Sequence, residues 1–198
     1  MKVLVACEFS GVVREAFRAK GHEVWSCDLL PPLDDSPYHY EGDVHEFLRK
    51  RYIDKWVPDL IIAHPPCTYL TVAGNRYYAH RPDLYEPARD FAISFFNYAE
   101  KVCVENPVGR LASLFRKPDQ IIQPYEFGED ASKKTCLWLK GLPNLVVNPV
   151  ERKSGRLVEY PKGSGKIVER WGNQTDSGQN NLGPSDDRSN LRSITYKK

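Results

Sequence analysis

Short apolar runs separated by one helical segment open the chain. Residues 2–7 and 23–27 are apolar runs of strand length, and residues 12–20 between them have a helical pattern that ends at Gly21. Strand, helix and strand within about 30 residues form a βαβ unit, which requires parallel strands. The opening pattern therefore predicts a parallel sheet.

The same alternation continues as far as residue 139, with longer polar segments between the apolar runs. A continuous apolar run without polar alternation is typical of a strand that is buried on both faces. The pattern predicts a loop over 30–40, a helix over 44–55, a strand over 58–63, a loop over 64–87, a helix over 88–100 and strands over 101–104, 119–127 and 134–139.

The composition changes near Asn148, where the apolar runs stop. Residues 156–160 and 166–171 have the pattern of two hairpin arms, and residues 172–190 are rich in Gly, Asn, Ser and Asp, which predicts flexibility. We therefore expect an α/β domain with a Rossmann-like, mostly parallel sheet over residues 1–147. A small, irregular and partly flexible region follows over 148–198.

Composition indicates the class of protein but does not identify a binding partner. The 198 residues are 41% hydrophobic and 27% charged, as in an ordinary water-soluble domain. No apolar run reaches the roughly 18 residues that a membrane span needs, so we expect no membrane association. The formal charge of +2 does not by itself indicate nucleic acid. Basic residues concentrate between positions 110 and 170, which fits either a phosphate-contacting surface or a solvated one.

The five cysteines are scattered and form no CxxC pair, so we expect neither a zinc site nor a disulfide framework. Cys7, Cys27, Cys103 and Cys136 stand in strand-like apolar runs and are interpreted as buried small hydrophobic residues. Cys67 is different, because it follows two prolines and precedes polar residues. Scattered, unpaired cysteines of this kind are typical of a protein in the reducing cytoplasm.

Polar side chains follow four of the predicted strands. These strand ends carry Glu8 to Gly11, Asp28, Cys67 with its prolines, and Glu105 with Asn106. In an open parallel sheet, ligands bind beyond the carboxyl ends of the strands. The sequence therefore places its most reactive side chains along one edge.

Several of these residues have two interpretations. Asp28 suits a ribose diol, because a carboxylate accepts from both hydroxyls, but a turn cap explains it as well. Asp43 fits an adenine amino group or an N-cap of the following helix. Ser10-Gly11 permits close backbone approach at a helix start, without the full GxGxxG pattern.

The Pro-Pro-Cys loop and the Glu-Asn strand end are more specific. Two prolines stiffen a loop that can hold the Cys67 thiol outside the core, where its thiolate reaches an electrophile; the alternative is a structural cysteine. Glu105 follows an apolar strand, and a carboxyl there could hydrogen-bond a ring nitrogen of a base; the alternative is a surface carboxylate.

Together these segments resemble the cytosine-C5 DNA methyltransferase family over about residues 1–140. Residues 6–11 stand in the place of its first cofactor motif, and residues 41–44 resemble its adenine-contacting motif. Residues 58–67 resemble its catalytic loop, and residues 104–107 its Glu-Asn motif. The resemblance implies a methyltransferase fold that binds S-adenosylmethionine, and methyl transfer to C5 of cytosine in double-stranded DNA.

The resemblance also assigns roles to single residues. The catalytic residues it implies are Cys67, Glu105 and Asn106. The cofactor-binding residues it implies are Cys7, Glu8, Phe9, Ser10, Gly11, Asp28, Leu29, Asp43, Val44 and Pro65. The DNA- or base-contacting residues it implies are Thr71, Lys133 and Lys134.

The chain departs from the family pattern at several points. Glu8 replaces a glycine of the first motif, and His64 stands where glycine is common. Lysines 133 and 134 replace an arginine, and residues 192–195 resemble the motif after the recognition region. The chain resembles a compact, phage-type member without the final motif helix, so a second copy or a partner could complete the cofactor pocket. The alternative function is a catalytically silent DNA-binding or regulatory homologue.

Overall fold

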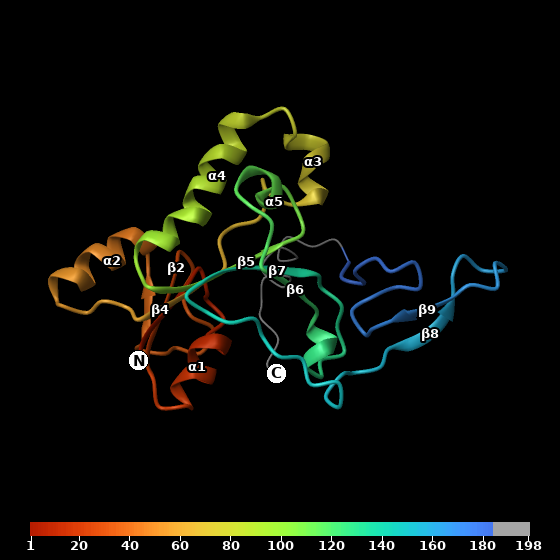
Figure 1. Ribbon diagram of the computed structural model, residues 1–198, viewed down its shortest axis with the longest axis horizontal. Helices are drawn as coiled ribbons and strands as arrows, with labels where there is room; N and C mark the ends of the chain where they lie inside the picture. Colours follow the sequence, from red (N-terminus) through yellow and green to blue (C-terminus); the bar gives the residue numbers. More distant parts are fainter. Residues whose placement is uncertain (184–198) are drawn as a thin grey trace. The chain divides into compact units, whose positions relative to one another are not determined.

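The computed structural model describes residues 1–183 of the chain. They divide into two compact units, which are considered separately below (Figure 1). The first unit comprises Met1–Ile121 and Thr135–Asn144. The second comprises Ile122–Lys134 and the chain from Leu145 onward, so the segment 122–134 groups with the C-terminal residues.

The first unit contains a seven-stranded sheet and most of the helices. Its strands are β1 (Lys2–Ala6), β2 (Glu23–Asp28), β3 (His39–Glu41), β4 (Leu60–Ala63), β5 (Lys101–Pro107), β6 (Gln120–Ile122, which ends at the boundary between the units) and β7 (Thr135–Lys140). Its helices are α1 (Val12–Arg18), α2 (Val44–Ile53), α3 (Val72–Tyr78), α4 (Pro82–Ser94), the 3-10 helix η1 (Phe95–Asn97) and α5 (Leu111–Leu114).

The strand order is β3-β2-β1-β4-β5-β7-β6. The first five strands in this order are parallel, and β7 is antiparallel to β5. The chain runs outward from β1 to β3 and then returns to β4 on the other side of β1, which makes β1 and β4 the switch point of the sheet. This is the α/β, Rossmann-like, mostly parallel sheet that the sequence predicted.

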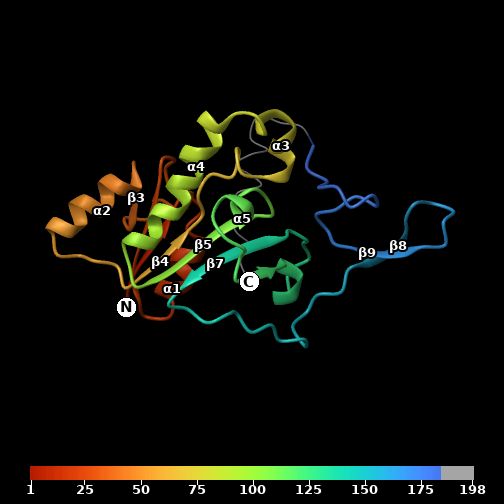
Figure 2. The ribbon, with the colours of Figure 1, turned by 45° about the horizontal axis from the view of Figure 1, so that its top comes forward.

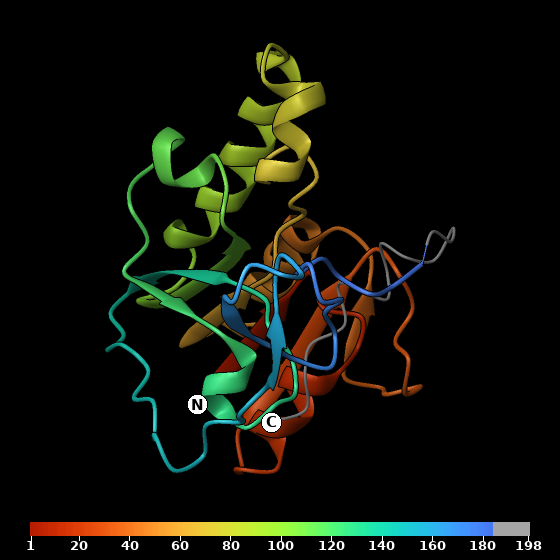
Figure 3. The ribbon, with the colours of Figure 1, turned by 90° about the vertical axis from the view of Figure 1, so that its right-hand side faces the viewer.

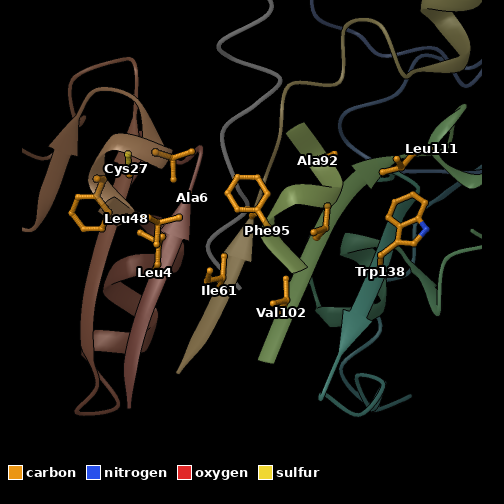
Figure 4. Packing of buried hydrophobic residues seen from close by; sticks show 14 of the residues in the cluster. Leu4, Ala6, Cys27, Leu48, Ile61, Ala92, Phe95, Val102, Leu111 and Trp138 are labelled. Carbon is orange, nitrogen blue, oxygen red and sulfur yellow. The ribbon is translucent and has the colours of Figure 1, made fainter. Parts of the chain in front are cut away.

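Two hydrophobic clusters pack against the sheet, one on each face. Strand residues Ala6, Ile61 and Val102 pack in the larger cluster with α2 and α4, and Phe95 at its centre is fully buried (Figure 4). Burial of such a side chain contributes roughly 1.5–3 kcal/mol. The smaller cluster lies under α1. Figure 3 shows α1 and α4 on opposite sides of the strands. In the described part of the chain, no helix is long and apolar enough to cross a membrane.

The prediction of a loop over 64–87 is wrong from Val72 onward, where α3 and the start of α4 lie instead (Figure 2). Prolines suggested a loop, but Pro82 occupies the first position of α4, where a helix needs no N–H donor. Pro87 lies inside the same helix at the loss of one backbone hydrogen bond.

The strand predictions need three smaller corrections. The expected loop over 30–40 ends in the short strand β3, and β5 extends beyond residue 104 to Pro107 because it pairs with β7 along its whole length. The expected strand over 119–127 stops at Ile122. A 3-10 helix, η2 (Pro124–Phe127), follows, because Pro124 has no N–H for a strand ladder.

The second unit contains η2 and the two-stranded sheet of β8 (Arg156–Glu159) and β9 (Ile167–Arg170). These strands pair antiparallel, as the hairpin pattern predicted. The ring of Tyr125 stacks on Trp171 with centroids 3.9 Å apart and planes 8° apart, which joins η2 to the end of β9. The expected flexibility of residues 172–190 stays a prediction, and from residue 184 it lies outside the described residues.

Candidate active site

The loop that carries Cys67 leaves β4 at the switch point of the sheet. His64 N–H still donates to the carbonyl of Ala6 on β1 at 2.9 Å, so the ladder continues one residue past β4. The carbonyl of Cys67 then accepts from the N–H groups of Leu70 and Thr71, at 2.9 and 3.0 Å. Leu70 is fully buried and anchors this turn in the core. Cys67 itself is half-buried on the anchored turn.

The strand end after β5 holds the loop from the other side. The side-chain amide of Asn106 donates to the carbonyl of Pro65 at 3.0 Å, and Asn106 is only 1% exposed. Arg110 N–H donates to the carbonyl of Leu70 at 2.7 Å. A Cβ at Gly109 would lie 1.9 Å from that same carbonyl oxygen, so only glycine permits the approach.

Glu105 reaches the same edge on the other face of the sheet from Asn106. Side chains alternate along a strand, so Val104 and Asn106 face the α4 side and Glu105 faces the α1 side. The Glu105 carboxylate accepts a hydrogen bond from the Nδ1 atom of His64. Both side chains are about one-fifth exposed, at 19% and 18%. The structure thus brings the three predicted catalytic residues to adjoining strand ends.

A cavity of about 420 Å³ lies beyond the carboxyl ends of β1 and β2. Five predicted cofactor residues line it: Cys7, Asp28, Leu29, Asp43 and Val44. The loop after β4 contributes a second group of lining residues, Pro66, Thr68 and Tyr69. The predicted neighbour Pro65 is not among the lining residues and is held by Asn106 instead.

One wall of the cavity belongs to α4 and was not predicted. Leu84, Pro87, Ala88 and Phe91 line it from successive turns of this helix. Their spacing of three and four residues is the apolar stripe of a helix. The sequence carries this stripe, but its prolines favour a loop as far as residue 87, so the pattern predicted a helix only from residue 88.

Asp28 combines a turn-capping role with a place in the cavity wall. Its Oδ1 atom accepts from Leu30 N–H at 3.0 Å. Burial raises the pKa of its carboxyl above the ordinary 3.8, against the opposing influence of the Leu30 hydrogen bond and of His39 and His64. A partner that donates hydrogen bonds to the carboxylate would offset the cost of this burial.

Asp43 is an N-cap, as one of its two interpretations predicted. Its Oδ1 atom accepts from Glu46 N–H at 2.9 Å and so caps α2. The residue also lines the cavity. The adenine contact stays a prediction beside the observed cap.

The rest of the first motif starts a helix and does not line the cavity. Glu8 is 3% exposed, and its carboxylate accepts from Val13 N–H at 2.7 Å and from Arg14 N–H at 3.2 Å. Ser10 Oγ donates to the same carboxylate at 3.3 Å. Gly11 has φ of 72°, in the left-handed region that favours glycine. Phe9 contributes its carbonyl, which accepts from Leu33 N–H at 3.0 Å.

A buried arginine, which the sequence pattern did not indicate, fixes the loop after β2 near the start of α1. The side chain of Arg14 is fully buried. Its guanidinium donates to Ser26 Oγ at 2.7 Å and forms an ion pair with Asp34. Because Asp34 belongs to the loop after β2, the pair fixes that loop near the end of the strand that carries Asp28.

The predicted DNA-contacting residues fall in different places. Thr71 Oγ1 accepts from Gly74 N–H at 3.1 Å, the geometry of an N-cap for α3. Lys133 and Lys134 belong to the second unit, and their contact with a base stays a prediction. The motif at residues 192–195 lies outside the described residues.

The four cysteines interpreted as structural have raised pKa values. Burial is the main cause at each of them, and it raises the pKa of Cys27 and of Cys103 to about 12. Cys27 and Cys136 are buried, and Cys7 and Cys103 are half-buried. At neutral pH all four therefore stay protonated and unreactive.

Comparison with known proteins found structural likeness but no sequence relative. No protein-family model matches the chain, and no curated protein matches it. Among the solved structures that match is an E. coli protein assigned as a DNA modification methyltransferase encoded within a prophage. The two are 16% identical, with a TM-score of 0.42. The match covers 71% of this chain and 46% of the other, so this chain spans less than half of that protein's length.

Proposed function

We propose that this chain transfers a methyl group from S-adenosylmethionine to C5 of cytosine in DNA, with Cys67 as the nucleophile. The observation that carries the proposal lies within the first unit. The loop of Cys67 and the strand end of Glu105 are joined through Asn106, and residues of that loop line the cavity that Asp28 also lines. This arrangement supports the proposal, because the proposed nucleophile, the proposed acid and the cavity all lie at the carboxyl ends of neighbouring strands.

The cavity suits the proposed cofactor in size and chemistry. About 420 Å³ falls within the usual range for small-molecule sites. Asp28 would accept from the ribose hydroxyls, and Asp43 offers a carboxylate to an adenine amino group. Val44 and Phe91 supply apolar surface for the purine ring. When bound, S-adenosylmethionine supplies an electrophilic methyl group on a positively charged sulfur.

Cys67 and Glu105 have complementary tasks toward the base. The Cys67 thiolate forms a bond to C6, and the electron pair of the C5–C6 double bond makes C5 nucleophilic. Glu105 accepts a hydrogen bond from the exocyclic amine with one carboxyl oxygen. In its protonated form it donates from the other oxygen to N3, where negative charge develops. Formation of the C5–CH3 bond would break the S–CH3 bond of the cofactor and release S-adenosylhomocysteine. Loss of the C5 proton to a base, with cleavage of the C6–S bond, would then restore the double bond and the Cys67 thiolate.

Duplex DNA is the proposed partner. A cytosine inside a duplex is not accessible to a thiol at a sheet edge, so the base must flip out of the stack. Lys133 and Lys134 are proposed to hold the cytosine carbonyl or a flanking phosphate. Completion of the cofactor pocket by a second copy or another protein stays a prediction.

The test replaces Cys67 by serine and follows isotopic methyl transfer from S-adenosylmethionine to DNA, with the modified base identified. Cys67→Ser should abolish methyl transfer and leave the fold intact, because a hydroxyl is a far poorer nucleophile at neutral pH. DNA that contains 5-fluorocytosine should trap a covalent adduct with the wild type only, because fluorine blocks the final elimination.

The matched control is Cys103→Ser, which makes the same change at a thiol held protonated by burial. This control should transfer methyl groups like the wild type. Full activity of Cys67→Ser would overturn the proposal. DNA binding by the wild type without any methyl transfer would favour the alternative of a silent DNA-binding homologue.

A further inference from the structure

His64 and Glu105 are neighbours because of the register between β4 and β5. Ala63 pairs with Val104 in the parallel ladder, so the next residue on each strand is His64 and Glu105. Alternation along both strands then places the two side chains on the same face. The hydrogen bond from His64 Nδ1 to Glu105 Oε2 follows from this placement.

From this geometry we propose that His64 is a positioning residue that orients the Glu105 carboxyl group toward the cytosine ring. The proposal rests on the proposed function and deepens it. The last torsion of a glutamate side chain is broad, so a free carboxyl samples many orientations. A hydrogen bond to one oxygen fixes the carboxyl plane before the base arrives, and fixed donors and acceptors cost no reorganisation during the reaction.

The surroundings of the pair make the imidazole the fitting donor. The backbone of His64 is held by its hydrogen bond to Ala6, and the ring is mostly shielded at 18% exposure. Titratable groups that interact with the pair include Cys103 and Cys136 with Glu105, and Asp28 with His64. Each of these groups is neutral or negative, whereas His64 provides an N–H that a carboxylate accepts.

The test compares three variants by single-turnover methylation and by steady-state kinetics. His64→Leu removes the donor and should lower kcat on the order of 10- to 100-fold, by analogy with the loss when the partner that orients a metal ligand is removed. The KM values for DNA and cofactor should change little, because His64 is not proposed to touch either. His64→Asn keeps an N–H near the place of Nδ1 and should recover most of the rate. His22→Leu is the matched control before β2, at the opposite edge of the sheet, and should behave like the wild type.

The outcomes separate this inference from the proposed function. Methyl transfer by the wild type establishes the reaction, and its absence overturns the proposed function. If the wild type is active, an unchanged rate in His64→Leu overturns the positioning role, and so does an equal loss in His64→Leu and His64→Asn. If His64→Leu does not fold, His64→Gly is assayed with and without added imidazole. Restoration by imidazole supports the role, and a full rate without it overturns it.

Discussion

Different interactions stabilise each of the two units of this protein. In the first, fully buried side chains such as Phe95 and Trp138 pack against the sheet. In the second, the buried apolar side chains among the described residues are Ala131 and Trp171. Its order depends on the Tyr125–Trp171 stack and on polar contacts at the surface.

The ion pair of the second unit illustrates the difference. Arg152 and Glu169 form two hydrogen bonds, of 2.6 and 3.2 Å, in the geometry that planar guanidinium and carboxylate groups favour. Arg152 also lies 5.1 Å from the ring centroid of Tyr125. Such exposed contacts are screened by salt, whereas the apolar clusters of the first unit are not. The proposed catalytic residues thus lie in the unit with the large buried core, and the proposed phosphate contacts lie in the unit that depends on its ionic surroundings.

The largest expected effect is on the stability of the first unit. Phe95→Ala should lower the free energy of unfolding by about 3–5 kcal/mol, because it leaves a cavity at the centre of the larger cluster. Chemical denaturation followed by circular dichroism measures the change. Arg152→Gln in the second unit is the comparison and should have a much smaller effect. Equal losses in the two variants would contradict the difference between the units.

The next effect concerns the cofactor. Asp28→Ala should weaken S-adenosylmethionine binding by roughly 1.5–3 kcal/mol, the usual value of hydrogen bonds to a charged group. Calorimetry on the full chain measures it. Unchanged affinity would show that Asp28 only caps the turn at Leu30.

The pH dependence of the same binding sharpens this result. In the proposed complex the carboxylate form of Asp28 would accept from the ribose, and burial raises the pKa of this carboxyl. Affinity should therefore be complete above that pKa and fall as the pH drops through it, at a higher pH than an ordinary aspartate would give. Asp28→Asn should bind more weakly than the wild type and lose this part of the pH dependence.

The smallest effect concerns DNA affinity through the second unit. Lys153, Lys162 and Lys166 are exposed, whereas Arg152 is occupied by Glu169. Replacing the three lysines by glutamine should weaken duplex binding, and the log–log salt slope should fall by about 0.9 for each phosphate that is no longer neutralised. Binding across a salt series gives the slope.

A matched variant makes the same charge change at the opposite edge of the sheet. Lys20, Lys55 and Lys101 are exposed. Lys20 and Lys55 precede β2 and β4, and Lys101 begins β5, so all three lie at the amino ends of the strands, away from the cavity. Their replacement should leave the salt slope unchanged. Parallel lines for both triple variants and the wild type would remove these second-unit lysines from the proposed DNA contact.

The sequence by itself determined the sheet and most of the edge where the candidate site lies. Apolar runs of strand length specify β1, β2 and β4 because a buried parallel strand has no polar face, so local composition is sufficient. The predicted strands also define where each strand ends, and this places Cys67, Asp28 and Glu105 at the carboxyl edge of the sheet. The register could not be predicted, because it depends on strand pairing between residues about 40 positions apart.

Only the tertiary structure decided what each side chain contacts. Glu8 belonged to a predicted cofactor motif, but it accepts from the first turn of α1. Pro87 indicated a loop, but packing against the sheet offsets the missing hydrogen bond and turns α4 into a wall of the cavity. His64 was a departure from a family pattern until register placed it beside Glu105. The contact of Glu8 is local, five and six residues along the chain, but a motif shared with cofactor loops does not distinguish it from a ligand contact. The contacts of α4 and of His64 are long-range, and a local pattern does not encode them because they form only when distant segments pack together.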